Sequence, residues 1–213
     1  MTRIYTAEPQ PRMDERVNRD VGAVVTALDL DAELMLRVKD GDGASFGILL
    51  DKHRVPVVHF LYRMVQNHAV AEELAQEVFL RVYRSRATYE PTAKFTTWLF
   101  RIATHLALNS LRDGKHDRTQ ERLDDTAPDM PVRQVPDVKP SVEQSMVHQA
   151  KMEEVRKAVA ALPEKQRAAV LMHKYQEMEY TQIAKVLNCS ESAVKSLLFR
   201  AYETLRARLA HMA

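Results

Sequence analysis

Residues 71–112, AEELAQEVFLRVYRSRATYEPTAKFTTWLFRIATHLALNSLR, decide the fold that this chain is expected to adopt. On both sides of Pro91 the apolar residues recur every three or four positions, which is the period of a helix with one packed face. Pro91 cannot continue a helix because its ring removes a backbone donor. The stretch therefore predicts two amphipathic helices joined by a loop over residues 87–94.

The two predicted helices differ in what they leave exposed. The first packs one face through Ala71, Leu74, Ala75, Val78, Phe79 and Val82. Its other face is mostly acidic and polar and is free to meet a partner. The second has an apolar stripe of Phe95, Leu99, Ile102 and Leu106, with Trp98 beside it. Thr96 or Thr97 is the expected N-cap, because a hydroxyl there accepts a backbone N–H that lacks a partner within the helix.

The chain before this hairpin predicts two more helices. Residues 1–27 mix prolines and charges without periodicity and are expected to form a flexible extension. A helix then starts with Asp31 as its candidate N-cap and breaks at residues 41–43, Gly-Asp-Gly. The next helix starts near Ala44, and Pro56 is a candidate position for a kink in it.

After Arg112 the composition changes from helical to linker-like. Residues 113–140 contain four prolines, few apolar side chains and more acidic than basic residues. A second helical region follows, opened by a capping box between Ser141 and Gln144. Pro163 is expected to open the next helix.

Residues 180–209, YTQIAKVLNCSESAVKSLLFRAYETLRARL, predict a helix-turn-helix. Thr181 is the expected cap of a short helix, and Asn188 tolerates the left-handed backbone of a turn. Ser190 then caps a longer helix. Taken alone, this pattern also fits an ordinary helical hairpin, but the lysine and arginines of the longer helix favour a polyanion as its partner.

Composition supports an all-α protein and excludes several function classes. The 213 residues suffice for two small domains and include only five glycines, which disfavours a sheet with many tight turns. A net charge of +2 is too small for a protein that coats nucleic acid, so DNA binding must come from local clusters. The single cysteine, Cys189, cannot form an internal disulfide, and no apolar run is long enough for a membrane span, which predicts a cytoplasmic protein. The histidines have no metal-ligand spacing, so no metal or other cofactor is expected.

The hairpin resembles region 2 of the bacterial RNA polymerase sigma-70 family, specifically the small extracytoplasmic-function (ECF, group IV) sigma factors. The first block of the resemblance consists of Glu72, Glu73, Leu74, Gln76, Glu77, Phe79, Leu80 and Arg81. The second consists of Phe95, Thr97, Trp98, Leu99, Arg101, Ile102, Ala103 and Asn109. Region 4 of the same family is matched by Ser190, Val194, Lys195, Ser196, Leu198, Arg200 and Ala201.

The resemblance implies three binding surfaces. The clamp helices of the largest subunit of core polymerase would dock on Glu72, Glu73, Leu74, Gln76, Glu77, Phe79 and Leu80. A melted minus-10 element would be bound by Tyr89, Lys94, Phe95, Trp98, Arg101, Thr104, His105 and Asn109. The minus-35 element would be read in the major groove by Lys195, Ser196, Phe199 and Arg200. From the residues alone, Phe95 and Trp98 fit core packing better, and the acidic face fits an ordinary solvated surface.

Several positions depart from the family pattern. Leu197 stands where many relatives have arginine, and Ser192 and Glu177 stand where glycine is common. His105 replaces a frequent asparagine, and His173 occupies a position that is often basic. The minus-35 sequence therefore does not follow from these residues.

Together these patterns predict an alternative sigma factor that binds core polymerase, recognises a two-part promoter and melts its minus-10 element. The expected organisation is a flexible extension over residues 1–27, a region 2 domain over 28–115, a linker over 116–140 and a region 4 domain over 141–213. An anti-sigma factor is implied as a regulator. The alternatives are a free-standing helix-turn-helix regulator, disfavoured by the lack of a dimerising heptad, and a helical enzyme, disfavoured because no nucleophile, base and orienting group occur together.

Overall fold

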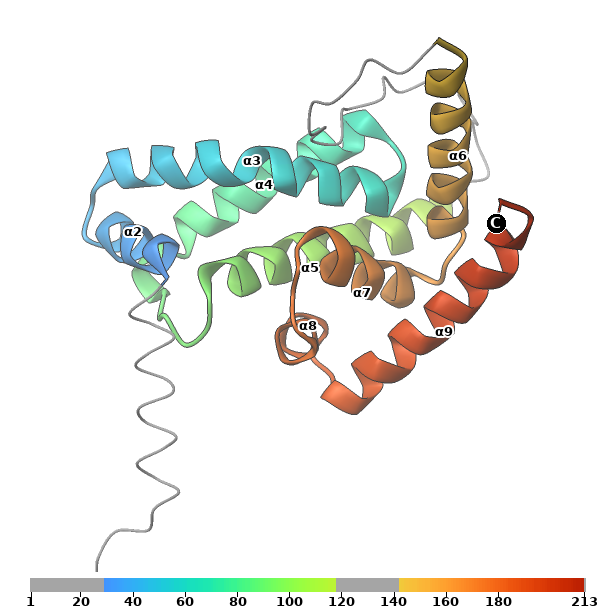
Figure 1. Cartoon of the computed structure of the whole chain (residues 1–213). Helices are drawn as coiled ribbons and strands as arrows, with labels where there is room; N and C mark the ends of the chain where they lie inside the picture. Colours follow the sequence, from blue (N-terminus) through green and yellow to red (C-terminus); the bar gives the residue numbers. More distant parts are fainter. Residues whose placement is uncertain (1–28, 118–141, 213) are drawn as a thin grey trace, which may run out of the picture.

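The computed structural model describes residues 29–117 and 142–212, and all regular structure within these ranges is helical. The longer elements are α2 (Leu30–Lys39), α3 (Gly43–Val65), α4 (His68–Arg84), α5 (Phe95–Asp117), α6 (Val142–Ala160), α7 (Glu164–Tyr175), α8 (Tyr180–Leu187) and α9 (Glu191–Leu209). Two short 3-10 turns, η1 (Arg86–Thr88) and η2 (Ala210–Met212), follow α4 and α9. The helices form an N-terminal group, α2–α5, and a C-terminal group, α6–α9 (Figure 1). The all-α prediction is confirmed.

The predicted hairpin is α4 and α5, and α3 packs against both. α4 begins at His68, before the predicted start, because the Asn67 side chain accepts the Val70 N–H at 3.0 Å and caps the helix. Asp42 caps α3 in the same way, accepting N–H groups from Ala44 and Ser45. α3 continues through Pro56 to Val65. The centre of this group is filled by fully buried side chains, among them Phe60, Leu61, Met64, Phe95, Leu99 and Phe100.

The start of α5 differs from the prediction. The helix begins at Phe95, so Thr96 and Thr97 lie inside its first turn, and Thr97 is buried. The Phe95 N–H instead donates to the Asp29 carboxylate at 2.5 Å, which brings the chain just before α2 to the start of α5. A carboxylate also complements the positive end of the helix dipole. The predicted threonine cap was therefore wrong, because the acceptor comes from a residue distant in sequence.

Asp31 is also not an N-cap. It lies in the first turn of α2, and its buried carboxylate bonds Lys52 Nζ at 2.7 Å and His53 Nε2 at 2.9 Å on α3. α5 is longer than predicted, since it continues past Arg112 and Gly114 to Asp117. A glycine inside a helix costs only about 1 kcal/mol and does not stop it when no proline follows. The linker-like composition that starts at residue 113 therefore begins inside α5.

The C-terminal group contains the predicted helix-turn-helix, α8 and α9. Asn188 adopts a left-handed backbone with φ 50° between them, and Ser190 Oγ caps α9 by accepting the Ala193 N–H at 3.1 Å. Pro163 precedes α7 as predicted. Thr181 is not the cap of α8: that helix starts one residue earlier, and Gln182 Oε1 accepts the Glu179 N–H at 2.9 Å. The predicted Ser141 capping box lies outside the described residues.

The two groups of helices are packed together. α8 contacts α5, while α6 and α7 contact α3, and α9 packs on α6, α7 and α8. Buried side chains of both groups form one continuous hydrophobic core. In Figure 1, α8 lies beside α5, and α6 stands beside the end of α3.

Acidification is expected to destabilise this fold in the range where histidine titrates. Burial lowers the pKa of His53 below its ordinary 6.5, although the Asp31 carboxylate works in the opposite direction. Burial also lowers the pKa values of His59 and His173. Between these lowered values and 6.5 the unfolded chain binds more protons than the folded chain, so stability falls as pH falls. We expect the unfolding temperature to rise from pH 5 to pH 7 and then level off.

Thermal unfolding at several pH values, followed by circular dichroism, checks this expectation. His53→Gln removes one titrating group and should make the slope between pH 5 and pH 7 shallower, whatever its effect on the absolute stability. An unchanged slope in that variant would show that His53 does not contribute to the pH dependence.

Candidate nucleic-acid and polymerase interfaces

The second helix of the helix-turn-helix has one buried and one exposed side. Val194, Leu198 and Ala201 face the core of the C-terminal group. All four residues predicted to read the minus-35 element are exposed on α9: Lys195, Ser196, Phe199 and Arg200. Phe199 is 68% exposed, which is unusual for a phenylalanine and leaves its ring free for an apolar contact. The structure thus brings these four side chains together on one accessible helix surface.

Two of these residues make contacts within α9. Lys195 Nζ pairs with the Glu191 carboxylate at 3.0 Å, and Ser196 Oγ donates to the Ser192 carbonyl at 3.1 Å. Such an exposed ion pair contributes at most about 1 kcal/mol, so Lys195 is readily available to a phosphate or a base. Glu177, in the loop before α8, has φ 51°, a left-handed backbone that glycine would adopt without strain.

The α5 residues predicted to meet the minus-10 element separate into two sets. Arg101, His105 and Asn109 are exposed, and their spacing of four residues places them in one row along the helix. Thr104 is fully buried, and its hydroxyl has no hydrogen-bond partner among the described residues. In this structure Thr104 therefore cannot touch a DNA strand, and its predicted role in direct reading is not supported by its position.

The loop before α5 is anchored by an aromatic cluster of Tyr89, Phe95 and Trp98. The Tyr89 and Trp98 ring centroids lie 4.9 Å apart, and those of Phe95 and Trp98 lie 5.8 Å apart. Tyr89 and Phe95 are buried and Trp98 is half-buried, as core packing predicts. Burial raises the pKa of Tyr89 to about 12. Of this part of the predicted minus-10 set, Lys94 is exposed and Trp98 is partly accessible, whereas Tyr89 and Phe95 are packed inside.

The predicted polymerase-docking face of α4 is partly accessible. Glu72, Glu73 and Gln76 are exposed, and Leu80 is 48% exposed. Glu77 pairs with Arg81 at 2.7 Å. Leu74 is half-buried against the core, and Phe79 is only 7% exposed, so it packs inside instead of offering an anchor.

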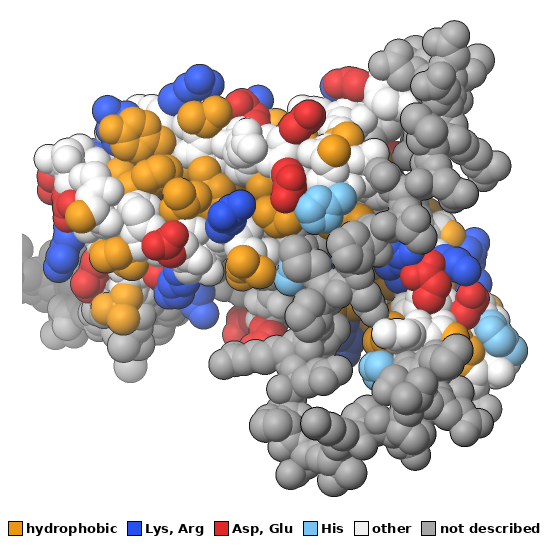
Figure 2. Space-filling model, turned by 90° about the horizontal axis from the view of Figure 1, so that it is seen from above, with side chains coloured by type: hydrophobic (Ala, Val, Ile, Leu, Met, Phe, Trp, Pro, Cys, Tyr) orange, Lys and Arg blue, Asp and Glu red, His pale blue; other side chains and the backbone are white. Residues whose placement is uncertain are grey.

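An exposed apolar surface next to this face was not predicted from the sequence. Ile48 and Val55 on α3 are each 54% exposed, and Tyr83 on α4 is 41% exposed. Hydrophobic side chains gather over α3 and α4 on the face seen in Figure 2. Ile48 and Val55 are seven residues apart, so they lie on the same side of α3. This spacing is a signal that could have been found in the sequence. Exposed apolar patches of this kind usually mark a partner surface.

Comparison with known proteins identifies the family. The sequence models of two parts of the sigma-70 family match this chain, region 2 over residues 49–117 and region 4 over residues 152–205. RNA polymerase sigma factor CarQ of Myxococcus xanthus is 34% identical over 179 residues, which cover 84% of this chain and 97% of that protein. The chain belongs to the sigma-70 family. It is an alternative sigma factor of the ECF type, similar to ECF sigma factor SigW of Bacillus subtilis at 31% identity over 176 residues, 81% of this chain and 93% of SigW.

Solved structures support the fold of this sigma factor. CnrH, in complex with the cytosolic domain of CnrY, superposes with a TM-score of 0.64 at 18% identity, covering 86% of this chain and 99% of CnrH. The sigma factor RpoE of Bartonella quintana, in complex with the anti-sigma factor NepR, gives a TM-score of 0.61 at 18% identity, covering 78% and 96%. Within residues 29–117 and 142–212, no helix has the length and apolar character needed to cross a bilayer.

Proposed function

We propose that this sigma factor docks on core RNA polymerase through α4 and directs it to a two-part promoter, reading the minus-35 element with α9 and the minus-10 element with α5. The observation that carries the proposal is the geometry of α8 and α9. Asn188 makes the turn, Val194 and Leu198 hold α9 against the core, and the opposite side presents Lys195 and Arg200 to solvent. This is how a helix-turn-helix places its second helix in the major groove.

The exposed row on α5 supports a role in holding a melted strand. Arg101 supplies a positive charge for the phosphate backbone, while the His105 ring and the Asn109 amide can stack on or hydrogen-bond a base. An unpaired base costs a few kcal/mol of lost stacking, which contacts of this kind return. These residues bind and position DNA and carry out no covalent step.

The accessible part of α4 supports docking on polymerase. Glu72, Glu73 and Gln76 offer an acidic and polar surface, with Leu80 beside them as an apolar anchor. Complementary charge on the partner would steer association. Leu80 would become buried in the complex and stabilise it. We further propose an anti-sigma factor as regulator, since RpoE of Bartonella quintana is solved in complex with the anti-sigma factor NepR. We also propose a cytoplasmic location, where the polymerase works.

Run-off transcription with purified core polymerase and a pool of promoter fragments tests the proposal. Discrete transcripts should appear only when this sigma factor is added. Replacing Glu72 and Glu73 with lysine should weaken co-elution with core polymerase by about tenfold or more, because the steering charge is reversed. The matched control combines Glu33→Lys on α2 with Asp40→Lys just after α2, both at exposed positions. This double variant changes the net charge equally and should leave co-elution within about twofold of the native value.

Two results would contradict the proposal. The first is equal loss of co-elution in the control, which would mean that net charge and not the α4 face governs binding. The second is tight binding to duplex DNA with no co-elution and no transcripts, which would favour the free-standing regulator.

A further inference from the structure

One short helix, α2, holds both ends of the loop that precedes α5. The loop over residues 89–94 forms neither helix nor strand. At its start, Lys39 Nζ donates to the Tyr89 carbonyl at 3.0 Å. At its end, the Asp29 carboxylate accepts the Phe95 N–H at 2.5 Å. Asp29 and Lys39, which we call the brace, lie just before α2 and at its last position, so the two contacts come from opposite ends of one helix.

α2 is anchored to the N-terminal group independently of the loop. The buried Asp31 carboxylate ties its first turn to Lys52 and His53 on α3. Met35 and Val38, further along the helix, are 0% and 1% exposed in the core. Moving α2 would break a buried polar contact and expose these side chains, which is costly. The helix, about 15 Å long, therefore gives the two ends of the loop attachment points at a constant separation.

The brace leaves the middle of the loop accessible. Glu90, Thr92 and Lys94 are exposed between the two attachments. Tyr89 is buried, and its ring centroid lies 4.9 Å from that of Trp98. A loop that is already ordered loses less conformational entropy on binding than a loop that must become ordered. The brace thus prepares the exposed side chains of the loop for one binding geometry.

The loop leads directly into the exposed row on α5. Lys94 precedes Arg101 by seven residues, or two helical turns, which places it at the head of the row that continues with His105 and Asn109. The Lys94 carbonyl already accepts the Thr97 N–H at 3.0 Å, as the residue before a helix does. Fixing the Phe95 N–H through Asp29 therefore also fixes where Lys94 stands relative to the row.

We propose that Asp29 and Lys39 are positioning residues for minus-10 recognition, because they hold the loop over residues 89–94 in the form that binds the melted strand. The contact between this loop and the strand rests on the proposed function, whereas the brace itself does not.

The charge of Asp29 separates positioning from direct attraction to DNA. Its carboxylate is negative, and a phosphate backbone repels it. If charge alone mattered, removing this carboxylate would strengthen DNA binding. If Asp29 positions the loop, its removal weakens DNA binding. The two explanations thus predict opposite signs for the same substitution.

Fluorescence of Trp98, the only tryptophan of the chain, tests the brace without polymerase or DNA. Asp29→Ala combined with Lys39→Ala removes both contacts and keeps the net charge. Acrylamide should quench Trp98 about twofold more strongly in this variant than in the native chain, because Tyr89 no longer stays packed on the ring when the loop opens locally. Circular dichroism should show unchanged helix content.

The matched control combines Glu33→Ala with Arg37→Ala, which removes one acidic and one basic side chain from exposed positions of the same helix. Quenching in the control should equal that of the native chain. Lys39→Ala alone should still increase quenching, and it replaces only an exposed side chain, so it decides the question if the double variant does not fold. Equal quenching in the brace variants and the control would overturn the proposal.

Binding of the holoenzyme to a promoter fragment whose minus-10 element is already melted by mismatches tests the positioning role. Asp29→Ala should weaken this binding about tenfold, because the loop must then be ordered on binding. Asp29→Asn keeps an oxygen that can accept the Phe95 N–H and should restore most of the loss. Binding to a duplex that contains only the minus-35 element should not change in either variant.

Three outcomes would count against the positioning role. Unchanged or stronger binding by Asp29→Ala would overturn it, even if Trp98 shows that the brace exists. Equal weakening on the minus-35 duplex would show a general loss of structure and would overturn it as well. If the native holoenzyme binds neither fragment, the proposed function fails and the positioning role fails with it, while quenching of Trp98 still decides whether the brace exists.

Discussion

Alanine at both Lys195 and Arg200 is expected to reduce promoter-specific transcription by about 100-fold, because each side chain can contribute about 1–3 kcal/mol of base or phosphate binding. Both residues are exposed on the side of α9 opposite the buried Val194 and Leu198. The substitutions should leave folding intact, since exposed helix residues replaced by alanine rarely change stability by more than about 0.5 kcal/mol. Run-off transcription at fixed salt measures the loss, and thermal unfolding checks the fold.

The matched control removes the same charge elsewhere. Lys151 on α6 and Lys165 on α7 are exposed lysines away from the predicted reading surface, and replacing both with alanine should change transcription by less than about twofold. Equal reductions in the two double variants would show that general attraction to the DNA backbone, and not α9, governs promoter use.

The sequence predicted the structure correctly where the side chains that decide it are close together in the chain. Asn188 and Ser190 decide the turn and the cap of α9 from their own side chains, and both were placed correctly. The α4–α5 hairpin follows in the same way from apolar periodicity and one proline. The family resemblance identified this hairpin as part of region 2, whereas apolar periodicity alone predicts only a helical hairpin.

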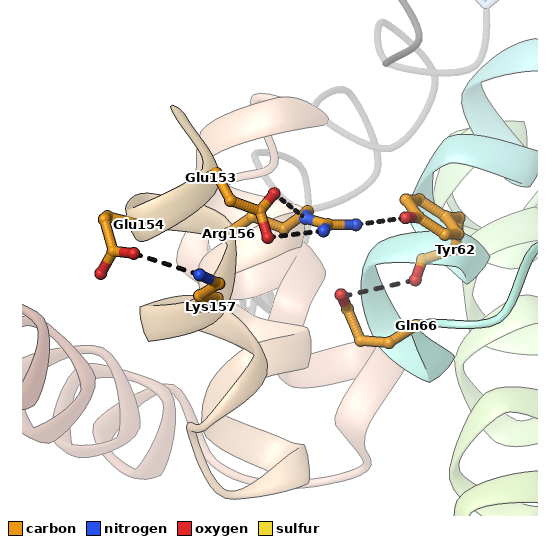
Figure 3. Close-up of polar contacts among 6 residues, drawn as sticks. All are labelled: Tyr62, Gln66, Glu153, Glu154, Arg156 and Lys157. Atoms are coloured by element: carbon orange, nitrogen blue, oxygen red, sulfur yellow. Dashed lines mark hydrogen bonds and ion pairs between the residues drawn. The ribbon is translucent and has the colours of Figure 1, made fainter. Parts of the chain in front are cut away.

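The errors arose where the partner is distant in sequence. Asp29 and Asp31 look like ordinary caps of α2, yet one accepts the first N–H of α5 and the other is buried against α3. Local capping rules favoured threonines as the caps of α5 and α8, because these rules consider only residues that are adjacent in sequence. The hydrogen bonds that Arg156 (Figure 3) and Arg167 donate to the end of α3 were not predicted for the same reason, since these arginines meet α3 only after folding.

Motif matching also does not distinguish a binding residue from one that supports it. The minus-10 motif includes Tyr89, Phe95 and Thr104, which are buried, beside Arg101 and His105, which are exposed. Phe79 on α4 is a similar case. A family pattern retains both kinds of residue, and only the packing of the helices separates them. The exposed apolar side chains on α3 are the opposite case, because they form a candidate partner surface although the motif does not include them.

Replacing Phe100 with alanine is expected to destabilise the fold by about 3–5 kcal/mol, a large share of the stability of a typical domain. Phe100 is 1% exposed, and its ring meets Phe60 edge to face, with centroids 5.2 Å apart and an interplanar angle of 87°. The cavity would lie between α3 and α5, so the row that carries Arg101 and His105 would lose its support. The unfolding temperature should fall by about 10 °C or more.

Phe199→Ala is the matched control, because it makes the same chemical change at a ring that is 68% exposed. Its unfolding temperature should stay within about 2 °C of the native value, while binding to a duplex containing the minus-35 element should weaken, since the ring lies between the α9 residues proposed to contact DNA. The two variants thus separate the phenylalanine that holds the helices together from the one that is available to a partner. Similar losses of stability in both would contradict the burial of Phe100 and the exposure of Phe199 on which the α5 and α9 assignments depend.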